Sequence, residues 1–214
     1  MRASSEETLV KRIRSLRENP ELRKTVENRL REFEDIGRRG ADIWMKEMAF
    51  CLLAANYSAV SAYKVAENLF SSGLLFNGSE DEIRSALVEE GYRFPSRSAY
   101  IVAAREIINE IRDSVPFMDD FRARDYLVNR VKGFGMKESS HFLRNIGRKN
   151  LAIVDRHIIR VVVEYNLMDE IRSLTKKRYL EVEEKLRKVA KKLEITLAEL
   201  DLYLWYMKTG FVFR

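Results

Sequence analysis

The sequence predicts an all-α protein, and three observations support this fold class. Apolar residues recur every three or four positions along almost the whole chain, as on one face of a helix, and no stretch alternates convincingly as a strand would. Only 3 of the 214 residues are proline and 9 are glycine, too few for a loop-rich or disordered protein. The 46% hydrophobic content provides a core for one large domain or two closely packed ones.

The same periodicity predicts many short helices rather than a simple bundle. Ser79 and Glu82 have the spacing of a capping box, and Ser96 is a candidate cap for the helix after Pro95. The prolines fall between helical segments, where proline is tolerated. The expected helices cover residues 4–17, 21–37, 41–55, 58–71, 80–90, 97–113, 119–131, 137–146, 156–165, 176–193 and 196–208.

The composition excludes several classes of site. One cysteine, Cys51, allows no disulfide framework and no cysteine-ligated cluster, and with two histidines it forms no convincing metal site. We therefore expect no metal, and because no Gly-rich nucleotide-binding loop appears we expect no cofactor either. No apolar run reaches about 18 residues, and the charged N-terminus has no signal-peptide core. These features predict a cytoplasmic protein with no membrane contact.

Positive charge is concentrated between residues 130 and 160. This window contains eight basic and two acidic residues, and its net charge of +6 equals that of the whole chain. Concentrated positive charge is typical of a surface that binds a polyanion, although a solvated basic face is the alternative. The basic residues are Arg130, Lys132, Lys137, Arg144, Arg148, Lys149, Arg156 and Arg160.

Two glycines lie one residue apart within this window, in VKGFGMK (131–137). Gly133 and Gly135 are expected to reverse the chain between two helices, because glycine permits positive φ angles and close approach. Backbone N–H groups of such a turn are expected to be unpaired and to bind a phosphate oxygen. A helix-capping turn without a ligand is the alternative, but Lys132 and the basic helix that follows favour a phosphate contact.

The segment VKGFGMKESSHFLRNIG (131–147), followed by LAIVDRHIIRVV, resembles the helix-hairpin-helix and acidic loop of the DNA glycosylase superfamily that includes endonuclease III. In its bifunctional members the lysine two residues after the second glycine is the nucleophile, and this lysine matches Lys137. An aspartate about 18 to 20 residues later, in a V-D-x-H loop, matches Asp155, with His157 after it. LLAANYSAVSAYKVA (52–66) is similar to a helix and turn whose amide contacts DNA, which matches Asn56.

Within this superfamily the chain looks like the compact archaeal-type 8-oxoguanine DNA glycosylase/lyases. The resemblance includes FCLLAANYSA, KGFGMKESSHFLRNIG, VDRHI and the ending LYLWYMKTGFVFR, while the four-cysteine iron–sulfur loop of endonuclease III is absent. In that subfamily the C-terminal residue, usually lysine, helps to distinguish 8-oxoguanine from guanine. Here the residue at this position is Arg214, which departs from the usual lysine but keeps its charge.

The resemblance implies base excision on duplex DNA containing 8-oxoguanine or an abasic site. Lys137 would attack the sugar of an extruded nucleotide and form a Schiff base, which then allows β-elimination. Its place at a helix N-terminus, near the positive end of the dipole, disfavours the ammonium form. Asp155 would stabilise positive charge at the sugar and assist proton transfer. A surface lysine and a simple helix N-cap are the respective alternatives.

Further residues are candidates for contact with the substrate or with DNA. Trp205 and Phe94 are candidates to stack on the extruded base, although both residue types are common in cores. Asn56 is a candidate contact near the extruded nucleotide, or else a helix-terminal amide. Lys132 and His157 are expected to contact phosphate, together with the hairpin glycines.

Other functions remain open at this point. A non-catalytic helix-hairpin-helix module would bind DNA without cutting it, and a related glycosylase would remove another lesion, such as an oxidised pyrimidine. An all-α interaction scaffold would leave the basic window unexplained. By resemblance, residues 1–214 form one helix-hairpin-helix glycosylase unit, expected to be a monomer. It would contain a central subdomain of about 58–150, with the hairpin at 131–147, and a second of about 1–57 plus 151–214, flanking an active-site cleft.

Overall fold

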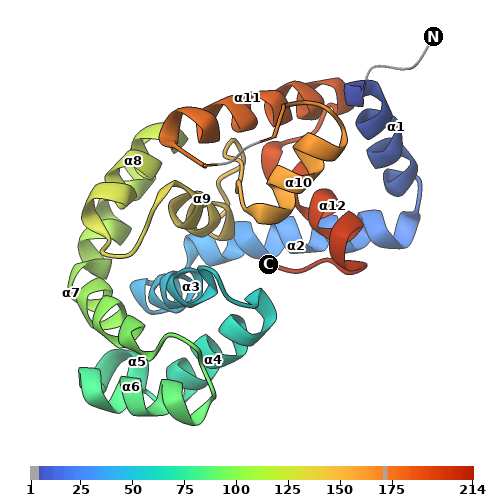
Figure 1. Ribbon diagram of the computed structural model, residues 1–214. Coiled ribbons are helices and arrows are strands. Elements are labelled where there is room, and N and C mark those ends of the chain that lie inside the picture. The colour runs from blue at the N-terminus through green and yellow to red at the C-terminus, as the bar shows by residue number, and fades with distance from the viewer. Residues whose placement is uncertain (1–4, 171–172) are drawn as a thin grey trace. The chain divides into compact units, whose positions relative to one another are not determined.

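The computed structural model of the protein describes residues 5–170 and 173–214, and in these residues it contains helices and no strands. The contacts between Cα atoms divide the chain into two compact units. The central unit is Asp35–Ile146, and the terminal unit is Met1–Glu34 with Gly147–Arg214. Figure 1 labels the helices of both.

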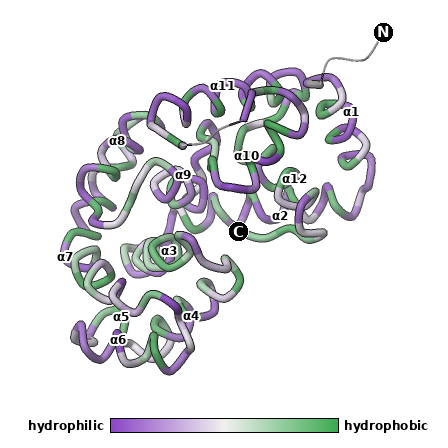
Figure 2. Tube along the Cα trace, in the orientation of Figure 1, coloured by the Kyte–Doolittle hydropathy of each residue, from purple (hydrophilic) through white to green (hydrophobic). Residues whose placement is uncertain are grey.

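The central unit is built around one buried helix, α3. Ten of its residues are buried, including Trp44, Phe50 and Cys51, so it is covered on almost every side. Helices α4, α7 and α9 contact it, and its tube is largely in the hydrophobic colour in Figure 2. The elements of this unit are α3 (Ala41–Ala54), α4 (Ala59–Ser71), α5 (Leu74–Asn77), α6 (Glu80–Glu89), η1 (Pro95–Arg97), α7 (Ser98–Ser114), η2 (Val115–Phe117), α8 (Asp120–Arg130) and α9 (Met136–Asn145).

The terminal unit packs helices from both ends of the chain together. Helix α11 buries a stripe that begins at Tyr179 and ends at Leu193, and it contacts α1 and α12. Arg14 and Arg17 of α1 donate hydrogen bonds to the last carbonyls of α11, which a helix end otherwise leaves without partners. The elements are α1 (Ser5–Arg17), the first part of α2 (Pro20–Arg38), α10 (Arg156–Glu164), α11 (Lys176–Leu193) and α12 (Leu197–Thr209).

The helices expected from periodicity agree with the observed ones to within one residue at each described end. The expected start of the first helix, residue 4, lies outside the described residues. The capping box at Ser79 is confirmed, because Glu82 donates its N–H to Ser79 Oγ and accepts the Ser79 N–H. The expected cap at Ser96 is wrong: this residue lies inside η1, and α7 begins only at Ser98. Short helix α5 and the two 3₁₀ helices were not expected.

The two units differ in extent from the subdomains expected from the resemblance, because the first boundary falls within α2 and not after residue 57. The reason is that α3 belongs to the core of the central unit through its contacts with α4, α7 and α9. No helix among the described residues is long and apolar enough to cross a membrane. Within the same residues, no group of three or more His, Cys, Asp or Glu side chains is arranged to hold a metal ion.

Candidate active site

The hairpin between α8 and α9 is held in place by two buried apolar residues. Val131 and Phe134 are 2% and 7% exposed, and the Phe134 N–H donates to the Val131 carbonyl at 3.0 Å. Between them, Gly133 is exposed and has a φ of +93°. The anchors therefore fix both sides of a turn whose tip faces solvent.

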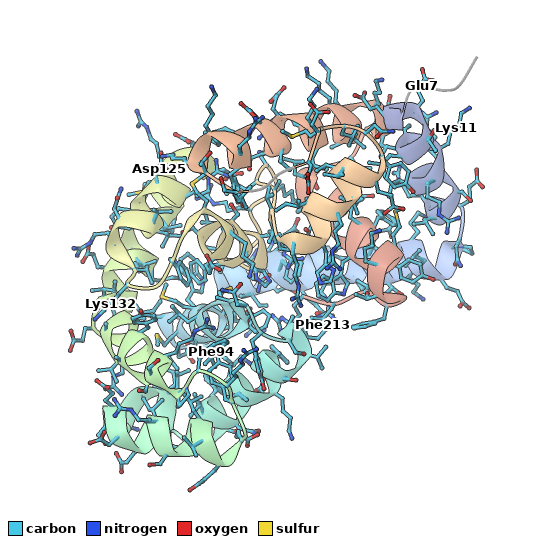
Figure 3. All side chains as sticks on the ribbon, viewed as in Figure 1. Glu7, Lys11, Phe94, Asp125, Lys132 and Phe213 are labelled. Carbon is cyan, nitrogen blue, oxygen red and sulfur yellow. The ribbon has the colours of Figure 1, made fainter. Side chains whose placement is uncertain are left out.

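Tyr100 of α7 lies directly under this tip. A Cβ atom on Gly133 would be 2.6 Å from Cδ2 of Tyr100 and 3.1 Å from Cδ2 of Leu52. The Lys132 amine lies 5.7 Å from the centroid of the Tyr100 ring, and Lys132 is labelled in Figure 3. The turn thus needs glycine at position 133 both for its φ angle and for the space. Gly135, in contrast, has an extended backbone with φ −111° and does not need the left-handed region.

The N-terminus of α9 carries Lys137 as its second residue. The Glu138 carboxylate accepts the N–H of Gly135 at 3.2 Å through Oε2, and its Oε1 lies 3.6 Å from the Lys137 amine. The side chains of Lys137 and Glu138 are 22% and 15% exposed. Two backbone N–H groups of the turn were expected to be unpaired but have partners in this structure: that of Phe134 donates to the Val131 carbonyl, and that of Gly135 donates to Glu138. The lysine is partly accessible and has a carboxylate beside it.

Polar side chains lie buried between α9 and α3. Asn145 donates to Glu47 Oε2 at 2.9 Å, and both residues are at most 1% exposed. Burial, reinforced by the nearby Glu47 carboxylate, raises the pKa of the Cys51 thiol well above its ordinary value. Arg144 is 2% exposed. These contacts attach the helix that carries Lys137 firmly to the core helix.

The basic window is consequently smaller at the surface than its sequence suggested. Arg144 is buried, and two other members have acidic partners at the surface: Arg130 pairs with Glu110, and Lys149 with Glu34. Lys132, next to the hairpin glycines, remains exposed.

Asn56 and Phe94 lie on two connections of the central unit that are held together. Tyr92 and Arg97 both donate hydrogen bonds to the Leu53 carbonyl near the end of α3, at 2.7 and 3.0 Å. Asn56 follows in the turn after α3; it is exposed and has a φ of +54°, a conformation that asparagine tolerates better than most residues. Phe94 is half-buried, with the Arg97 guanidinium 4.8 Å from its ring centroid, and is not a core residue.

Asp155 caps α10 in the terminal unit. Its Oδ1 accepts the N–H groups of His157 and Ile158 at 2.8 and 2.9 Å, and the side chain is half-buried. Asp155 is therefore the N-cap of α10, as the alternative interpretation of the sequence predicted. Because capping uses one carboxylate oxygen, it fixes the side chain and is compatible with a catalytic role for Asp155.

Trp205 lies in an aromatic cluster formed with the chain end. The His157 ring packs against it at 5.8 Å, and Phe211 and Phe213 each lie 6.4 Å away, between ring centroids. Gly210, with a φ of +81°, turns the chain after α12 so that the last residues return to this cluster; Phe213 is labelled in Figure 3. Trp205 and Arg214 are half-buried, and the Trp205 Nε1 has no hydrogen-bond partner among the described residues.

Comparisons with known proteins show the family of this chain. A family model described as 8-oxoguanine DNA glycosylase matches residues 26–195. The 8-oxoguanine DNA glycosylase/AP lyase of Korarchaeum cryptofilum is 43% identical over 90% of this chain and 92% of its own length. The corresponding protein of Methanocaldococcus jannaschii is 39% identical over 96% of this chain and 99% of its own. This chain belongs to the 8-oxoguanine DNA glycosylase family.

Solved structures of family members confirm the helix-hairpin-helix glycosylase fold. A crystal structure of the M. jannaschii 8-oxoguanine glycosylase/lyase with a 15mer DNA containing 8-oxoguanine has a TM-score of 0.91 and 36% identity, covering 97% of this chain and 100% of that one. The 8-oxoguanine DNA glycosylase of Thermotoga maritima has a TM-score of 0.89 and 37% identity, covering 98% and 100%. The family predicted from the hairpin, the acidic loop and the chain end is therefore confirmed.

In this family member each unit gathers some of the predicted site residues. The central unit brings together Lys132, Gly133, Gly135 and Lys137 at the hairpin, and carries Asn56 and Phe94 on two linked connections. The terminal unit places Asp155 and His157 at the start of α10, with His157 against Trp205. Arg214 ends the segment that returns to this cluster.

Sequence reasoning missed Glu138, although a signal for it was present. Glutamate three residues after an N-cap position is the second half of a capping box, and GMKE (135–138) has this spacing with glycine at the cap. It also missed Tyr92 and Arg97, because contacts between segments about 40 residues apart leave no local pattern.

Proposed function

We propose that this protein is a bifunctional DNA glycosylase and abasic-site lyase that removes 8-oxoguanine from duplex DNA. The observation that carries the proposal is the match, over at least 90% of the chain, to relatives named for both activities. The site chemistry agrees with it, because a partly exposed lysine follows directly after a phosphate-binding type of turn.

Lys137 is the proposed nucleophile. Its neutral amine attacks C1′ of the extruded nucleotide, and the bond between C1′ and the base nitrogen breaks. The base leaves with a proton, the sugar ring opens, and an iminium joins Lys137 to C1′. The iminium acidifies the C2′–H bond, so loss of that proton expels the 3′ phosphate and cuts the strand. The nearby Glu138 carboxylate is a charge partner for the amine before reaction.

Asp155 is the proposed catalytic carboxylate. Negative charge near the sugar stabilises the cationic character that develops as the base leaves. Its cap to α10 leaves Oδ2 without a role in the cap, so one oxygen fixes the side chain and the other remains for the reaction. A carboxylate held by two backbone N–H groups needs little reorganisation during the reaction.

The remaining predicted residues have proposed contacts with the substrate. Trp205 and Phe94 stack on the extruded base, and Arg214 contributes to recognition of 8-oxoguanine, while Asn56 contacts DNA near the extruded nucleotide. Lys132, His157 and the hairpin turn at Gly133 and Gly135 contact backbone phosphates, through donors other than the Gly135 N–H, which Glu138 accepts. We also propose that the protein acts as a monomer on nucleoid DNA in a prokaryotic cytoplasm, without a metal or organic cofactor.

The test is borohydride trapping on a panel of duplexes containing 8-oxoguanine, thymine glycol, uracil or an abasic site. The wild-type protein should form a covalent complex with the 8-oxoguanine and abasic duplexes and cut both. Lys137→Gln should abolish trapping while duplex affinity stays within about threefold, because glutamine preserves length without a nucleophilic amine. Lys132→Gln is the matched control: it removes an exposed hairpin lysine and should weaken binding but retain trapping.

The outcomes separate the alternatives. Salt-sensitive binding without trapping or cleavage on any duplex would mean a non-catalytic DNA-binding module. Preferential cutting of thymine glycol would mean an oxidised-pyrimidine glycosylase. Trapping that survives Lys137→Gln would assign the nucleophile to another amine.

A further inference from the structure

The segment that leads to Asp155 is buried and lies outside any helix, and no strand among the described residues pairs with it. Leu151, Ala152, Ile153 and Val154 are between 1% and 7% exposed, and no helix or strand includes them. A strand in a sheet finds partners for its backbone N–H and C=O groups on the next strand. Buried backbone groups without such a neighbour require partners from elsewhere.

Helix α11 supplies these partners from its side chains. Glu183 accepts the N–H of Ala152 at 2.9 Å. The Tyr179 hydroxyl donates to the Ala152 carbonyl at 2.6 Å and accepts the N–H of Val154 at 3.2 Å. Both side chains belong to residues that are only 2% exposed. Two side chains thus satisfy three backbone groups of the segment.

A third side chain extends the row in the same direction. Arg187 donates to the Asn150 carbonyl at 3.1 Å, and its Nη2 lies 3.5 Å from Glu183 Oε1. Tyr179, Glu183 and Arg187 are four residues apart and lie on one face of α11.

The spacing of this row matches the spacing of the segment. Four helical residues advance about 6 Å along the axis, and two extended residues advance about 6.6 Å. Side chains one turn apart on α11 can therefore form hydrogen bonds with the backbone of every second residue of the segment, namely Asn150, Ala152 and Val154. The row fixes the segment along its length as a neighbouring strand would.

We infer that Tyr179 and Glu183 are positioning residues for the catalytic carboxylate of Asp155. The last position held by Tyr179, Val154, directly precedes Asp155, and the cap of Asp155 on α10 directly follows. The aspartate is therefore fixed from both sides, by α11 before it and by α10 after it. This inference rests on the proposed function, because it assumes that the place of this carboxylate determines the rate of base release.

A double-mutant cycle tests the inference. Tyr179→Phe removes one hydroxyl and leaves the buried Ala152 carbonyl and Val154 N–H without this partner. Single-turnover release of 8-oxoguanine is measured for wild type, Tyr179→Phe, Asp155→Asn and the double variant. If Tyr179 acts through Asp155, its substitution should slow release about tenfold in the wild-type background and less than twofold in the D155N background. Duplex affinity should change less than twofold in both.

Matched variants separate positioning from general stability. Tyr126→Phe makes the same chemical change in an exposed hydroxyl that donates to Glu110, and it should leave release unchanged. Glu183→Gln retains an acceptor oxygen for the Ala152 N–H and should stay close to wild type, whereas Glu183→Ala should resemble Tyr179→Phe. If Tyr179→Phe does not fold, the same cycle with Glu183→Ala and Asp155→Asn decides the question.

Each outcome has a separate meaning. Equal slowing by Tyr179→Phe in both backgrounds would show that α11 supports the fold and does not act through Asp155, which overturns the inference. Normal release by Asp155→Asn alone would instead refute the catalytic role of Asp155 in the proposed function. Rescue by Glu183→Gln with loss in Glu183→Ala, together with a non-additive cycle, supports the inference.

Discussion

Gly133 lies so close to Tyr100 that a methyl group on its Cα would be 2.6 Å from the tyrosine ring. Its φ of +93° is also a conformation that side chains rarely adopt. Tyr100 therefore packs against the hairpin and leaves no space for a side chain at position 133. We expect Gly133→Ala to shift the turn, weaken duplex binding about tenfold and destabilise the protein by about 2 kcal/mol. Binding measured over a salt series, together with urea unfolding, checks this.

Gly91→Ala is the control for backbone strain alone. Gly91 has a φ of +66°, but a Cβ there would meet nothing within 4 Å. This variant should lose about 1 kcal/mol of stability and retain normal duplex affinity. If both alanine variants bind DNA normally, the hairpin tip does not contact the phosphate backbone.

Asp155 combines a cap with a charge, and two substitutions separate these roles. Asparagine is a good N-cap and can still accept the N–H groups of His157 and Ile158, so Asp155→Asn should change stability by less than about 0.5 kcal/mol. Without the negative charge, single-turnover base release should fall by about a hundredfold or more. Asp155→Ala should lose the same activity and about 1 kcal/mol of stability in addition. Urea unfolding and excision assays on the three proteins measure the two effects.

Two results would contradict the prediction for Asp155. If Asp155→Asn keeps its activity and only Asp155→Ala loses it, the residue acts as a cap and its charge is not needed. A loss of duplex binding that parallels the loss of excision would likewise assign Asp155 a structural role.

Arg214 is predicted to act on base recognition and not on strand cleavage. Arg214→Ala should slow excision of 8-oxoguanine at least tenfold. Cutting of a duplex with an abasic site should change less than twofold, because that site has no base for Arg214 to recognise. Arg214→Lys keeps the charge and should retain most of the excision activity. For each variant, the rate of 8-oxoguanine excision divided by the rate of abasic-site cleavage shows whether base recognition alone is affected. An equal loss on both substrates would mean that the chain end supports the Trp205 cluster instead.

The helices and the hairpin were predictable because their signals are local. Periodicity of apolar residues reports which face of a segment is buried, and it located the ends of α8 and α9 to within a residue. The spacing of Lys137 from the glycines is likewise contained in seven residues. Ser96 shows how a local signal fails: Pro95 starts a 3₁₀ turn that includes the serine, so the α-helix begins two residues later.

Contacts between distant segments were not predictable in the same way. The row of Tyr179, Glu183 and Arg187 holds a segment 25 to 37 residues earlier in the chain, and nothing in KRYLEVEEKLR (177–187) indicates this. Charge counting also failed for Arg144, because a sequence window does not show which side of a helix faces the core. Family resemblance suggested Lys137 and Asp155 as the reacting groups, but the contacts around these two residues required the structure.

Tyr92 leads to a prediction about stability at high pH. Its hydroxyl donates to the Leu53 carbonyl and accepts a hydrogen bond from Arg97, each at 2.7 Å, while the residue is only 3% exposed. Burial raises the pKa of Tyr92 to about 12, although the nearby Arg97 acts in the opposite direction. In the unfolded chain a tyrosine has a pKa of about 10. Between these values the unfolded state loses its proton first, so the folded state becomes less stable as pH rises.

The stability lost through Tyr92 should amount to about 2 to 3 kcal/mol between pH 10 and pH 12 and should be negligible below pH 9. Tyr92→Phe should cost about 1 kcal/mol at pH 7, because two hydrogen bonds are lost, and should show a shallower decline above pH 10. Urea unfolding at pH 7, 9, 10, 11 and 12 gives both curves, and their difference cancels the titration of the other tyrosines and the lysines. Tyr126→Phe, which changes an exposed hydroxyl, should follow the wild type. Parallel curves for wild type and Tyr92→Phe would mean that the Tyr92 hydroxyl ionises as readily in the folded protein as in the unfolded chain.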